Sequence, residues 1–462
     1  MLLTADGHYL GPVRVLLVST YELGHQPLHI ASPAAALIDD GHAVECLDLA
    51  VEPWDDGKFE WAEAVAFSVP MHTAMRLGVQ AARRLRLSRP GVPVAFYGLY
   101  AAVGADRTLP ELAERLIVGE YEDELRAWVN DSSGGRGIRV DLRPQRFRVP
   151  ARHLLPPLDR YARLEVSPAT YLAGYVEASH GCRHRCRHCP IPAVYDGRYR
   201  TTGLDVVLAD VAQLKLAGAR HITFGDPDFL NAPRYALDVL REVNAAFPDL
   251  TFDLTAKVEH ILHHATIWDD LARRNVIFVV SAFETTNNRI LSILDKGHTV
   301  ADMGAAVSLL RAGGIEIRPS WLPFTPWTGP GDLAEIFEFL AHHDLLATVD
   351  PVQLSIRLLI PEGSLLLNRP EMAPYLGAYD GDSLTYQWQG SPAAESLRVE
   401  LAGLAEAGAD TVTTIERMWR VARPGEPSPT WPDRAVPRLT EAWFCCAEPT
   451  TRQLEAVASP LI

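Results

Sequence analysis

The stretch His180-Gly-Cys182-Arg-His-Arg-Cys186-Arg-His-Cys189-Pro190 follows directly on a predicted strand at residues 174–178. Three cysteines this close together can turn their thiolates toward three corners of an Fe4S4 cube. A fourth cysteine is absent nearby, which would leave one iron open to a ligand from outside the protein. A zinc site completed by His184 or His188 is the alternative, and the uneven x3/x2 spacing after a strand favours the iron–sulfur interpretation.

Outward from this stretch, strands and helices alternate from residue 171 onward. Strands are predicted at 174–178, 221–224, 252–255, 276–281, 315–319 and 352–356. This pattern predicts a partial (β/α)6 barrel over residues 169–370. In such barrels the chemistry lies at the C-terminal ends of the strands, which is where the three cysteines stand.

Residues 1–130 predict a separate α/β domain. The apolar run at 13–19 is typical of a buried parallel strand. Further strand-like runs at 43–49, 64–69 and 92–97 alternate with helical stretches, so we expect a Rossmann-like, doubly wound sheet. Residues 131–168 are predicted as a connector, and residues 371–462 as a C-terminal extension whose tail packs on the barrel.

Composition narrows the class of protein. Of 462 residues, 48% are apolar and 22% charged, as in a globular protein. Asp and Glu outnumber Lys and Arg by 58 to 43, and the formal net charge of −15 argues against binding to duplex nucleic acid or an anionic membrane. The sequence shows no leader and no apolar stretch of spanning length, so a cytoplasmic location is expected.

The spacing Cys-x3-Cys-x2-Cys resembles the motif of the radical S-adenosylmethionine (SAM) superfamily, in which an aromatic residue usually precedes the third cysteine. Here that residue is His188. The resemblance covers roughly residues 170–370. It implies a [4Fe–4S] cluster on Cys182, Cys186 and Cys189, SAM chelated at the open iron, and an electron donor such as flavodoxin or ferredoxin.

Five residues at predicted strand ends are candidates for contacts to SAM: Asp226, Asp228, Lys257, Glu284 and Arg318. The sequence from Glu284 to Lys296-Gly297 is similar to the Glu…Lys-Gly pattern of the branch that carries an N-terminal cobalamin-type domain. Simpler interpretations are an Asp-Pro turn for the two aspartates, a helix N-terminal carboxylate for Glu284, and solvated cations for the other two.

The first domain resembles the cobalamin-binding domain of that branch, and Val118-Gly-Glu-Tyr-Glu122 matches its Gly-Glu-x-Glu station. The usual cobalt ligand comes from Asp-x-His-x-x-Gly, a spacing that neither His25 nor His29 has. Where the branch has a Gly-Gly pair, this chain has Gly98-Leu99-Tyr100, whose side chains would crowd the nucleotide channel. We therefore favour a retained scaffold without cobalamin, with cobalamin binding as the alternative.

Near the C-terminus, Cys445 and Cys446 stand next to each other. Adjacent cysteines rarely bond to each other, because the resulting ring strains the peptide between them. Two neighbouring thiolates can instead chelate a soft centre such as As(III), Zn(II) or Cu(I). Buried packing beside Trp443 and Phe444 is the alternative.

The tail Cys445-Cys-Ala-Glu-Pro449 resembles the one that names the CUAEP/CCAEP-tail radical SAM proteins, where selenocysteine can replace one cysteine. Members of that group occur with arsenic-metabolism genes. The resemblance implies transfer of the 3-amino-3-carboxypropyl group of SAM to arsenite or another soft acceptor, as the first step toward arsinothricin, with Cys445 and Cys446 catalytic. The alternatives are a cobalamin-dependent radical SAM methyltransferase and a non-enzymatic metal- or metalloid-binding protein.

Overall fold

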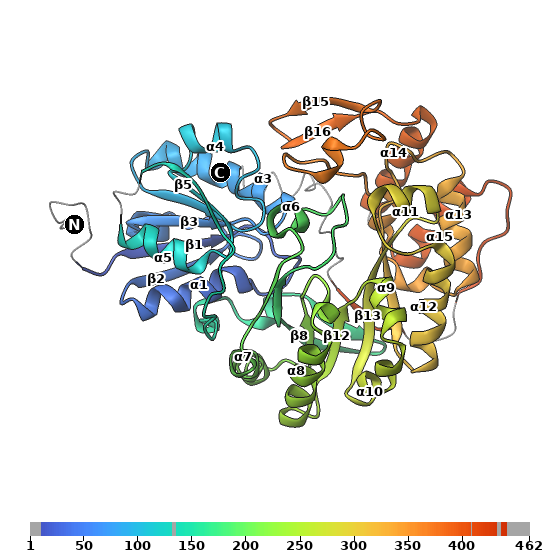
Figure 1. Ribbon diagram of the computed structural model, residues 1–462, viewed down its shortest axis with the longest axis horizontal. Coiled ribbons are helices and arrows are strands. Elements are labelled where there is room, and N and C mark those ends of the chain that lie inside the picture. Colours follow the sequence, from blue (N-terminus) through green and yellow to red (C-terminus); the bar gives the residue numbers. More distant parts are fainter. Residues whose placement is uncertain (1–10, 132–134, 408, 432–435, 441–462) are drawn as a thin grey trace.

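A computed structural model describes residues 11–131, 135–407, 409–431 and 436–440. Within these ranges the chain forms an N-terminal α/β domain and a half-barrel that lie side by side (Figure 1). The C-terminal helices α14 (Pro392–Glu406) and α15 (Thr411–Ala422) lie beyond the barrel on the side away from the N-terminal domain.

Six parallel strands form the N-terminal sheet, in the order β2-β1-β3-β4-β5-β6. They are β1 (Arg14–Ser19), β2 (Ala43–Asp48), β3 (Ala64–Ser68), β4 (Val94–Tyr97), β5 (Arg115–Gly119) and β6 (Gly137–Asp141). The helices around them are α1 (Leu28–Asp39), α2 (Asp56–Trp61), α3 (His72–Ser88), α4 (Ala105–Glu111) and α5 (Glu122–Asn130). Apolar side chains pack on both faces of the sheet, which explains the unbroken apolar run in β1.

Strand β6 lies inside the segment predicted as a connector. It pairs in parallel with β5 and extends the first sheet by one strand. Its apolar residues Ile138 and Val140 are 41% and 63% exposed, as on a sheet edge. The strand therefore lacks the buried apolar residues that mark a core strand. The sheet therefore reaches beyond the predicted boundary at residue 130.

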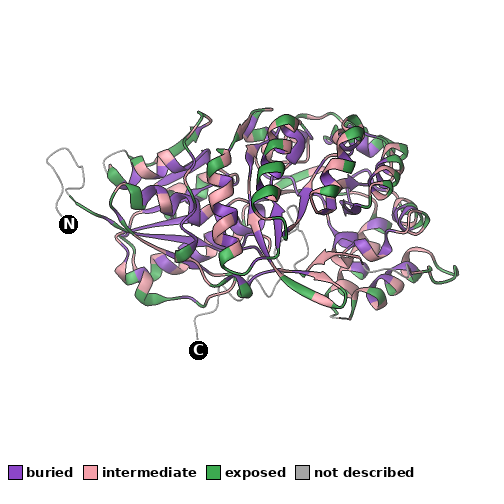
Figure 2. Ribbon diagram, turned by 90° about the horizontal axis from the view of Figure 1, so that it is seen from below, coloured by how far each residue is buried: buried purple, intermediate pink, exposed green. Residues whose placement is uncertain are grey.

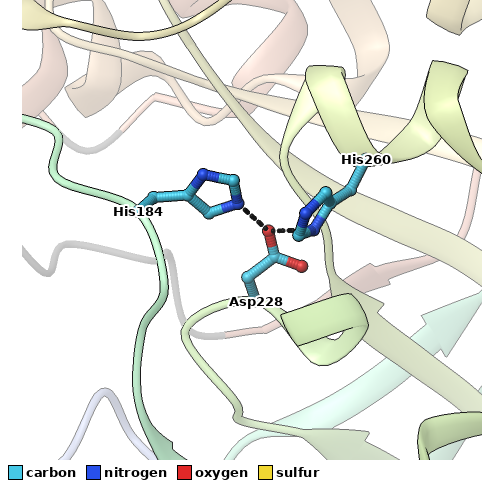
Figure 3. A group of neighbouring side chains, drawn as sticks. All are labelled: His184, Asp228 and His260. Carbon is cyan, nitrogen blue, oxygen red and sulfur yellow. Dashed lines mark ion pairs between the residues drawn. The ribbon is translucent and has the colours of Figure 1, made fainter. Parts of the chain in front are cut away.

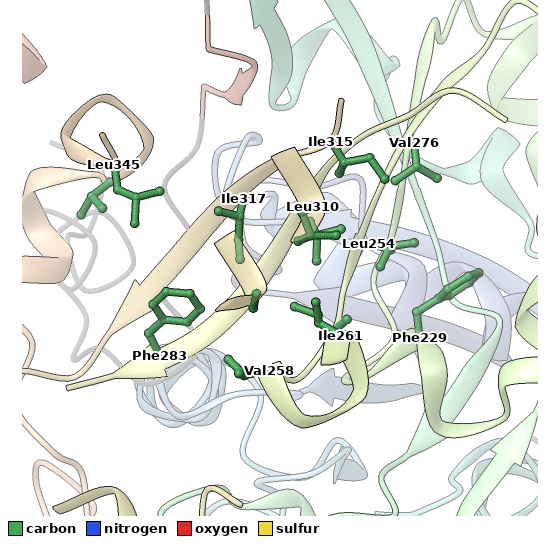
Figure 4. Packing of buried hydrophobic residues seen from close by; sticks show 14 of the residues in the cluster. Phe229, Leu254, Val258, Ile261, Val276, Phe283, Leu310, Ile315, Ile317 and Leu345 are labelled. Carbon is green, nitrogen blue, oxygen red and sulfur yellow. The ribbon is translucent and has the colours of Figure 1, made fainter. Parts of the chain in front are cut away.

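The second sheet has the order β14-β13-β12-β11-β8-β7-β17, and the five strands from β14 to β8 are parallel. Its strands are β7 (Arg163–Val166), β8 (Ala169–Val176), β11 (His221–Phe224), β12 (Thr251–Thr255), β13 (Val276–Glu284), β14 (Glu316–Trp321) and β17 (Arg438–Leu439). Apolar side chains such as Leu254, Phe283 and Ile317 fill the space between the strands and the helices (Figure 4). The predicted α/β fold class is confirmed.

The prediction of a sixth barrel strand at residues 352–356 is wrong. These residues form a 3-10 turn, η6 (Pro351–Ser355), and a single parallel bridge joins Phe324 to Arg357. Pro351 begins the turn and cannot donate to a strand ladder. The side chain of Gln353 accepts a hydrogen bond from Trp321 N–H at 3.2 Å, in place of a backbone bond at the end of β14.

The helices that cover the outside of the half-barrel alternate with its strands. They are α7 (Leu204–Leu216), α8 (Pro233–Ala246), α9 (Val258–His263), α10 (Trp268–Arg273), α11 (Asn288–Leu294), α12 (Val300–Ala312) and α13 (Asp332–His342). Helix α6 (Ile191–Tyr195) instead contacts β5 of the N-terminal domain and the short strand β9 (Ser179–Gly181). Burial colouring shows the strands of both domains as the buried interior and these helices with an exposed outer face (Figure 2). In the described part of the chain, no helix is both long and apolar enough to cross a membrane.

The C-terminal extension packs on both domains. Leu401 and Met418, on α14 and α15, are fully buried in the barrel core. The hairpin of β15 (Leu376–Asp380) and β16 (Thr385–Trp388) contributes Leu384 to the core of the N-terminal domain. Strand β17 then returns to pair antiparallel with β7. The extension thus joins the two domains.

Candidate active site

The three motif cysteines lie on the loop that follows β8 and the short strand β9 (Ser179–Gly181). Cys182 and Cys186 are buried and Cys189 is partly buried, and all three line one cavity of about 250 Å³. Gly181 precedes them with φ +77, and a Cβ there would lie 2.5 Å from the carbonyl oxygen of Arg198. Glycine is therefore required where the chain turns into the loop.

The three motif thiols line the same cavity, which allows them to share one metal group. Among the described His, Cys, Asp and Glu residues, the one group of three or more that could hold a single metal ion is His184, Asp228 and His260, and no cysteine belongs to it. Three thiols on one short loop fit three corners of an iron–sulfur cube.

No other described cysteine reaches this cavity. Cys46 is the remaining described cysteine; it is buried in β2 of the N-terminal sheet, where burial raises its pKa to about 12. Burial also raises the pKa of the Cys182 thiol to about 12, so a bound metal has to displace its proton.

Asn231 supports the loop that carries the cysteines, since its Oδ1 accepts a hydrogen bond from Arg183 N–H at 3.0 Å. Asn231 was not among the predicted site residues.

Glu284 ends β13 in the left-handed region, at φ +67, and is buried in the cavity wall. Its Oε1 lies 3.0 Å from Lys296 Nζ and 3.1 Å from His188 Nε2. Burial alone would raise the pKa of Glu284, but the charge of Lys296 and the imidazole outweigh it and hold that pKa well below its usual range. His188 stands where the cysteine motif usually has an aromatic residue. Its contact with Glu284 joins the cysteine loop to the end of β13.

The two predicted aspartates have different surroundings. Asp226 accepts hydrogen bonds from Ala178 N–H at 2.9 Å and Ser179 Oγ–H at 2.5 Å, and so holds the start of the cysteine loop. Burial raises the pKa of Asp226 to about 7. Asp228 lies in the wall of the cysteine cavity, where its Oδ2 is 3.2 Å from His184 Nε2 and 2.9 Å from His260 Nδ1.

Burial alone would raise the pKa of Asp228, but the two neighbouring imidazoles outweigh it and lower that pKa to about 2. Lys257 also lines the cavity, with its Nζ 3.1 Å from His184 Nδ1 and 3.2 Å from Glu259 Oε2. Asp228, Lys257 and Glu284 therefore line the same cavity as the three cysteines.

Arg318 lies apart from this group. Its Nη2 donates to Asp350 Oδ2 at 2.9 Å, and its guanidinium stands over the ring of Phe278. Arg318 and Asp226 line a second, smaller cavity inside the barrel, which shares Leu23 and Gln353 with the cysteine cavity. The structure thus brings three of the five candidate SAM residues to the cysteines and leaves two deeper in the barrel.

The N-terminal domain forms the opposite wall of the cysteine cavity, through Leu23, Met71, Leu99 and Tyr100. Tyr100 is only 3% exposed. Leu99 and Tyr100 thus place side chains in this wall at the positions where the related branch has glycine.

Neither histidine considered as a cobalt ligand is free to serve as one in this arrangement. His25 stacks on the ring of Tyr175 at 4.8 Å, and burial lowers the pKa of His25 to about 4. His29 Nδ1 lies 2.8 Å from Tyr121 Oη, and its Nε2 is 3.4 Å from Glu177 Oε1. The residues present therefore do not fit a histidine-ligated cobalamin.

The Gly-Glu-x-Glu station of the N-terminal domain contacts the cysteine loop directly. Glu120 Oε2 lies 3.1 Å from His180 Nδ1, and Glu120 Oε1 accepts from Tyr195 Oη–H at 3.2 Å. His180 stands two residues before Cys182, so the N-terminal domain positions the loop that carries the cysteines. Glu120 and Tyr195 were not predicted as site residues; the Gly-Glu-x-Glu match was the signal that pointed to Glu120.

Residues 176–340 match the family model described as the Radical SAM superfamily. The chain therefore carries a radical SAM domain, and such a domain implies a [4Fe–4S] cluster and SAM. More particularly, the fold is that of radical SAM enzymes with an N-terminal cobalamin-binding-like domain.

Curated relatives of known name are distant. The chain is 26% identical over 161 residues to the tRNA-2-methylthio-N(6)-dimethylallyladenosine synthase of Chlorobaculum tepidum, covering 33% of this chain and 36% of that protein. It is 25% identical over 293 residues to the hopanoid C-2 methylase of Rhodopseudomonas palustris, covering 61% and 53%. The chain spans about half the length, or less, of the curated relatives it matches.

Solved structures show the likeness of the fold. The cobalamin-dependent radical SAM enzyme OxsB, with aqua-cobalamin and SAM bound, superposes with a TM-score of 0.64 at 12% identity, over 85% of this chain and 66% of that one. The radical SAM methyltransferase TsrM from Kitasatospora setae, with cobalamin and a [4Fe–4S] cluster bound, gives 0.58 at 19% identity, over 72% and 73%. At these identities the likeness concerns the fold.

The predicted catalytic pair, Cys445 and Cys446, lies outside the described residues. The last described residues before them can be placed: Leu439, in β17, lines the smaller barrel cavity. Cys445 follows Leu439 by six positions.

Proposed function

We propose that this radical SAM enzyme transfers the 3-amino-3-carboxypropyl group of SAM to trivalent arsenic. The observation that carries the radical SAM part is the set of three thiols that line one cavity together with Asp228, Lys257 and the Glu284–Lys296 pair. When bound, the cluster supplies the electron that cleaves a sulfonium bond of SAM. A flavodoxin or ferredoxin is the proposed electron donor.

The residues around the cysteines have separate roles in this proposal. Glu284 offers a carboxylate to the methionyl amine of SAM, and Lys257 offers an ammonium group to its carboxylate. Met71, Leu99 and Tyr100 supply an apolar wall that keeps water from the reacting carbon.

The tail supports arsenic as the acceptor. Adjacent thiolates at Cys445 and Cys446 would hold As(III), a soft centre that prefers sulfur ligands.

In the proposed reaction the S–Cγ bond of SAM breaks, and methylthioadenosine leaves as a neutral thioether. The arsenic lone pair becomes the As–C bond, water supplies oxygen ligands as the thiolates leave, and arsenic is oxidised from As(III) to As(V). The sulfonium sulfur is reduced correspondingly, so the electron that starts the cleavage is recovered and no net reductant is consumed.

The experiment compares the reconstituted protein with its Cys445→Ser and Cys446→Ser variants, each given SAM, reductant and arsenite without oxygen. Mass spectrometry reads out a product that contains arsenic and the aminocarboxypropyl group. We expect this product from the unaltered protein and at least a hundredfold less from either variant, with four irons per chain retained in all three. Equal product from the variants would contradict a role for the tail thiols.

A cobalamin-dependent methyltransferase is the second candidate, favoured by the likeness to OxsB and TsrM. It predicts cobalt in protein purified from cells supplied with cobalamin. The side chains of Leu99 and Tyr100 in the cavity wall favour a cobalt-free protein. Stoichiometric cobalt would establish this candidate over the first.

A further inference from the structure

We propose that His184, Asp228 and His260 form a second metal site, which binds one divalent first-row cation such as Zn(II) beside the cysteine cavity. The three side chains converge from different parts of the chain: the cysteine loop, the segment after β11, and helix α9 (Figure 3). Their ligand atoms all lie within 4.8 Å of one another. This proposal stands independently of the arsenic reaction.

The two distances from the Asp228 carboxylate to the imidazoles match those between neighbouring ligands of one metal ion. Asp228 Oδ2 lies 3.2 Å from His184 Nε2 and 2.9 Å from His260 Nδ1. Ligands about 2.1 Å from a metal are about 3.0 Å apart when they are adjacent in an octahedron and about 3.4 Å apart in a tetrahedron. Two imidazoles and one carboxylate are a common ligand set for Zn(II) and Fe(II).

Two ring nitrogens of this group lack a hydrogen-bond partner among the described residues. Both nitrogens are close enough to Asp228 Oδ2 to hydrogen bond, yet among the described residues neither His184 Nε2 nor His260 Nδ1 has a hydrogen-bond partner. Two buried ring nitrogens that lie beside a carboxylate without a hydrogen bond would both be satisfied by a cation held between the three side chains.

The remaining contacts of the site would orient its ligands. Asp228 Oδ1 accepts from Leu230 N–H at 3.0 Å, which fixes the carboxylate and leaves Oδ2 for the metal. Glu259 Oε2, 3.8 Å from His184 Nδ1, is the nearby carboxylate that can accept the second ring N–H, as metal-bound histidines usually require. Lys257, which ion-pairs with Glu259, balances its charge.

Three protein ligands leave coordination positions open. Asp228 and His184 line the cysteine cavity, so the open side of the metal faces the same space. A water, or an oxygen atom of an anionic substrate group, would complete the coordination there. The site would thus fix an oxygen-bearing ligand next to the cluster loop.

Elemental analysis and calorimetry test the site in protein that already carries its iron–sulfur cluster. The holoprotein is titrated with Zn(II) without oxygen, and iron and zinc per chain are measured after desalting. We expect one zinc in addition to four irons. The variants His260→Ala and His260→Gln should bind zinc at least about tenfold more weakly while keeping their iron. The control is His263→Ala, an exposed histidine on the same helix, which should bind as the unaltered protein does.

Absence of a specific zinc in the unaltered holoprotein would overturn the proposal, and so would His260 variants that bind zinc as the control does. Cleavage of SAM is measured in the same samples. Loss of zinc binding with SAM cleavage intact would reject this site alone, whereas loss of SAM cleavage in the unaltered protein would reject the proposed function.

Discussion

Lys296 Nζ and Glu284 Oε1 lie 3.0 Å apart, and both residues are buried beside the cysteine loop. The same carboxylate oxygen is 3.1 Å from His188 Nε2, on the residue before Cys189. One carboxylate therefore joins the end of β13, the segment after α11 and the cysteine loop. The left-handed backbone of Glu284 is a strained conformation kept at the site itself.

The first prediction concerns the buried ion pair of Glu284 and Lys296. Glu284→Gln or Lys296→Met should each lower the free energy of unfolding by about 3–5 kcal/mol, because each leaves an unpaired buried charge. The double variant should be less destabilised than the sum of the two. Urea unfolding followed by tryptophan fluorescence measures all three. Single variants within 1 kcal/mol of the unaltered protein would contradict the pairing.

Iron content tests the cluster ligands. Replacing Cys182, Cys186 or Cys189 by Ala should reduce iron from four per chain to near zero after reconstitution, because two thiolates do not hold the cube. Cys46→Ala is the matched control, since Cys46 is buried in the N-terminal sheet. If iron is retained in the first three variants, or zinc is found in the unaltered protein in its place, the cluster assignment is wrong.

His72 makes a prediction about pH. It is fully buried with Nε2 2.9 Å from the Ser383 carbonyl oxygen, and burial lowers the pKa of His72 to about 4. In the unfolded chain His72 binds a proton below about pH 6.5, whereas in the folded chain it binds one only below about pH 4. The free energy of unfolding should therefore fall as pH drops through this window, by about 3 kcal/mol in all.

The measurement is urea unfolding of the unaltered protein and His72→Gln between pH 7.5 and pH 5. Glutamine can still donate to Ser383 but does not titrate, so the pH dependence should be shallower in the variant. His153→Gln, at an exposed position, is the control and should leave the slope unchanged. Parallel slopes in all three proteins would show that His72 is not the group responsible.

Arg152 links the two domains. Its guanidinium donates to both carboxylate oxygens of Asp210 at 2.9 and 2.8 Å, to Gln26 Oε1 at 3.2 Å and to the Tyr175 carbonyl oxygen at 2.6 Å. Lysine cannot reproduce this planar, forked contact, so Arg152→Lys should lower the free energy of unfolding by about 1–3 kcal/mol.

The exposed Arg146 supplies the control for this comparison, and Arg146→Lys should stay within about 0.5 kcal/mol of the unaltered protein. Thermal unfolding and limited proteolysis of both variants measure the effect. Equal behaviour of the two substitutions would show that the buried guanidinium contributes nothing specific.

Much of the fold follows from local patterns. Continuous apolar runs predict β1, β3 and β4 because parallel strands are covered on both faces. The sixth barrel strand was wrong because the hydropathy of residues 352–356 resembles that of a strand, while Pro351 and the Gln353 side chain decide the backbone in three dimensions. The edge strand β6 was missed because its apolar residues face outward.

The sequence predicts those parts of the site whose residues lie close together in the chain. The Cys182–Cys189 motif is local, and the structure places it on the cavity. The histidines that meet Asp228 come from segments about 30 and 45 residues away, so no spacing rule brings them together. Glu120 reaches the cysteine loop from the other domain, which a linear pattern shows only through the family's motif.

The most direct test of the enzyme's chemistry is the identity of the adenosine by-product. Reconstituted protein is incubated with SAM and reductant without oxygen, with and without arsenite, and the by-products are identified by mass. We predict methylthioadenosine, formed in amounts that rise with arsenite. Deoxyadenosine alone would contradict aminocarboxypropyl transfer, and intact SAM in a protein carrying four irons per chain would contradict the radical SAM assignment itself.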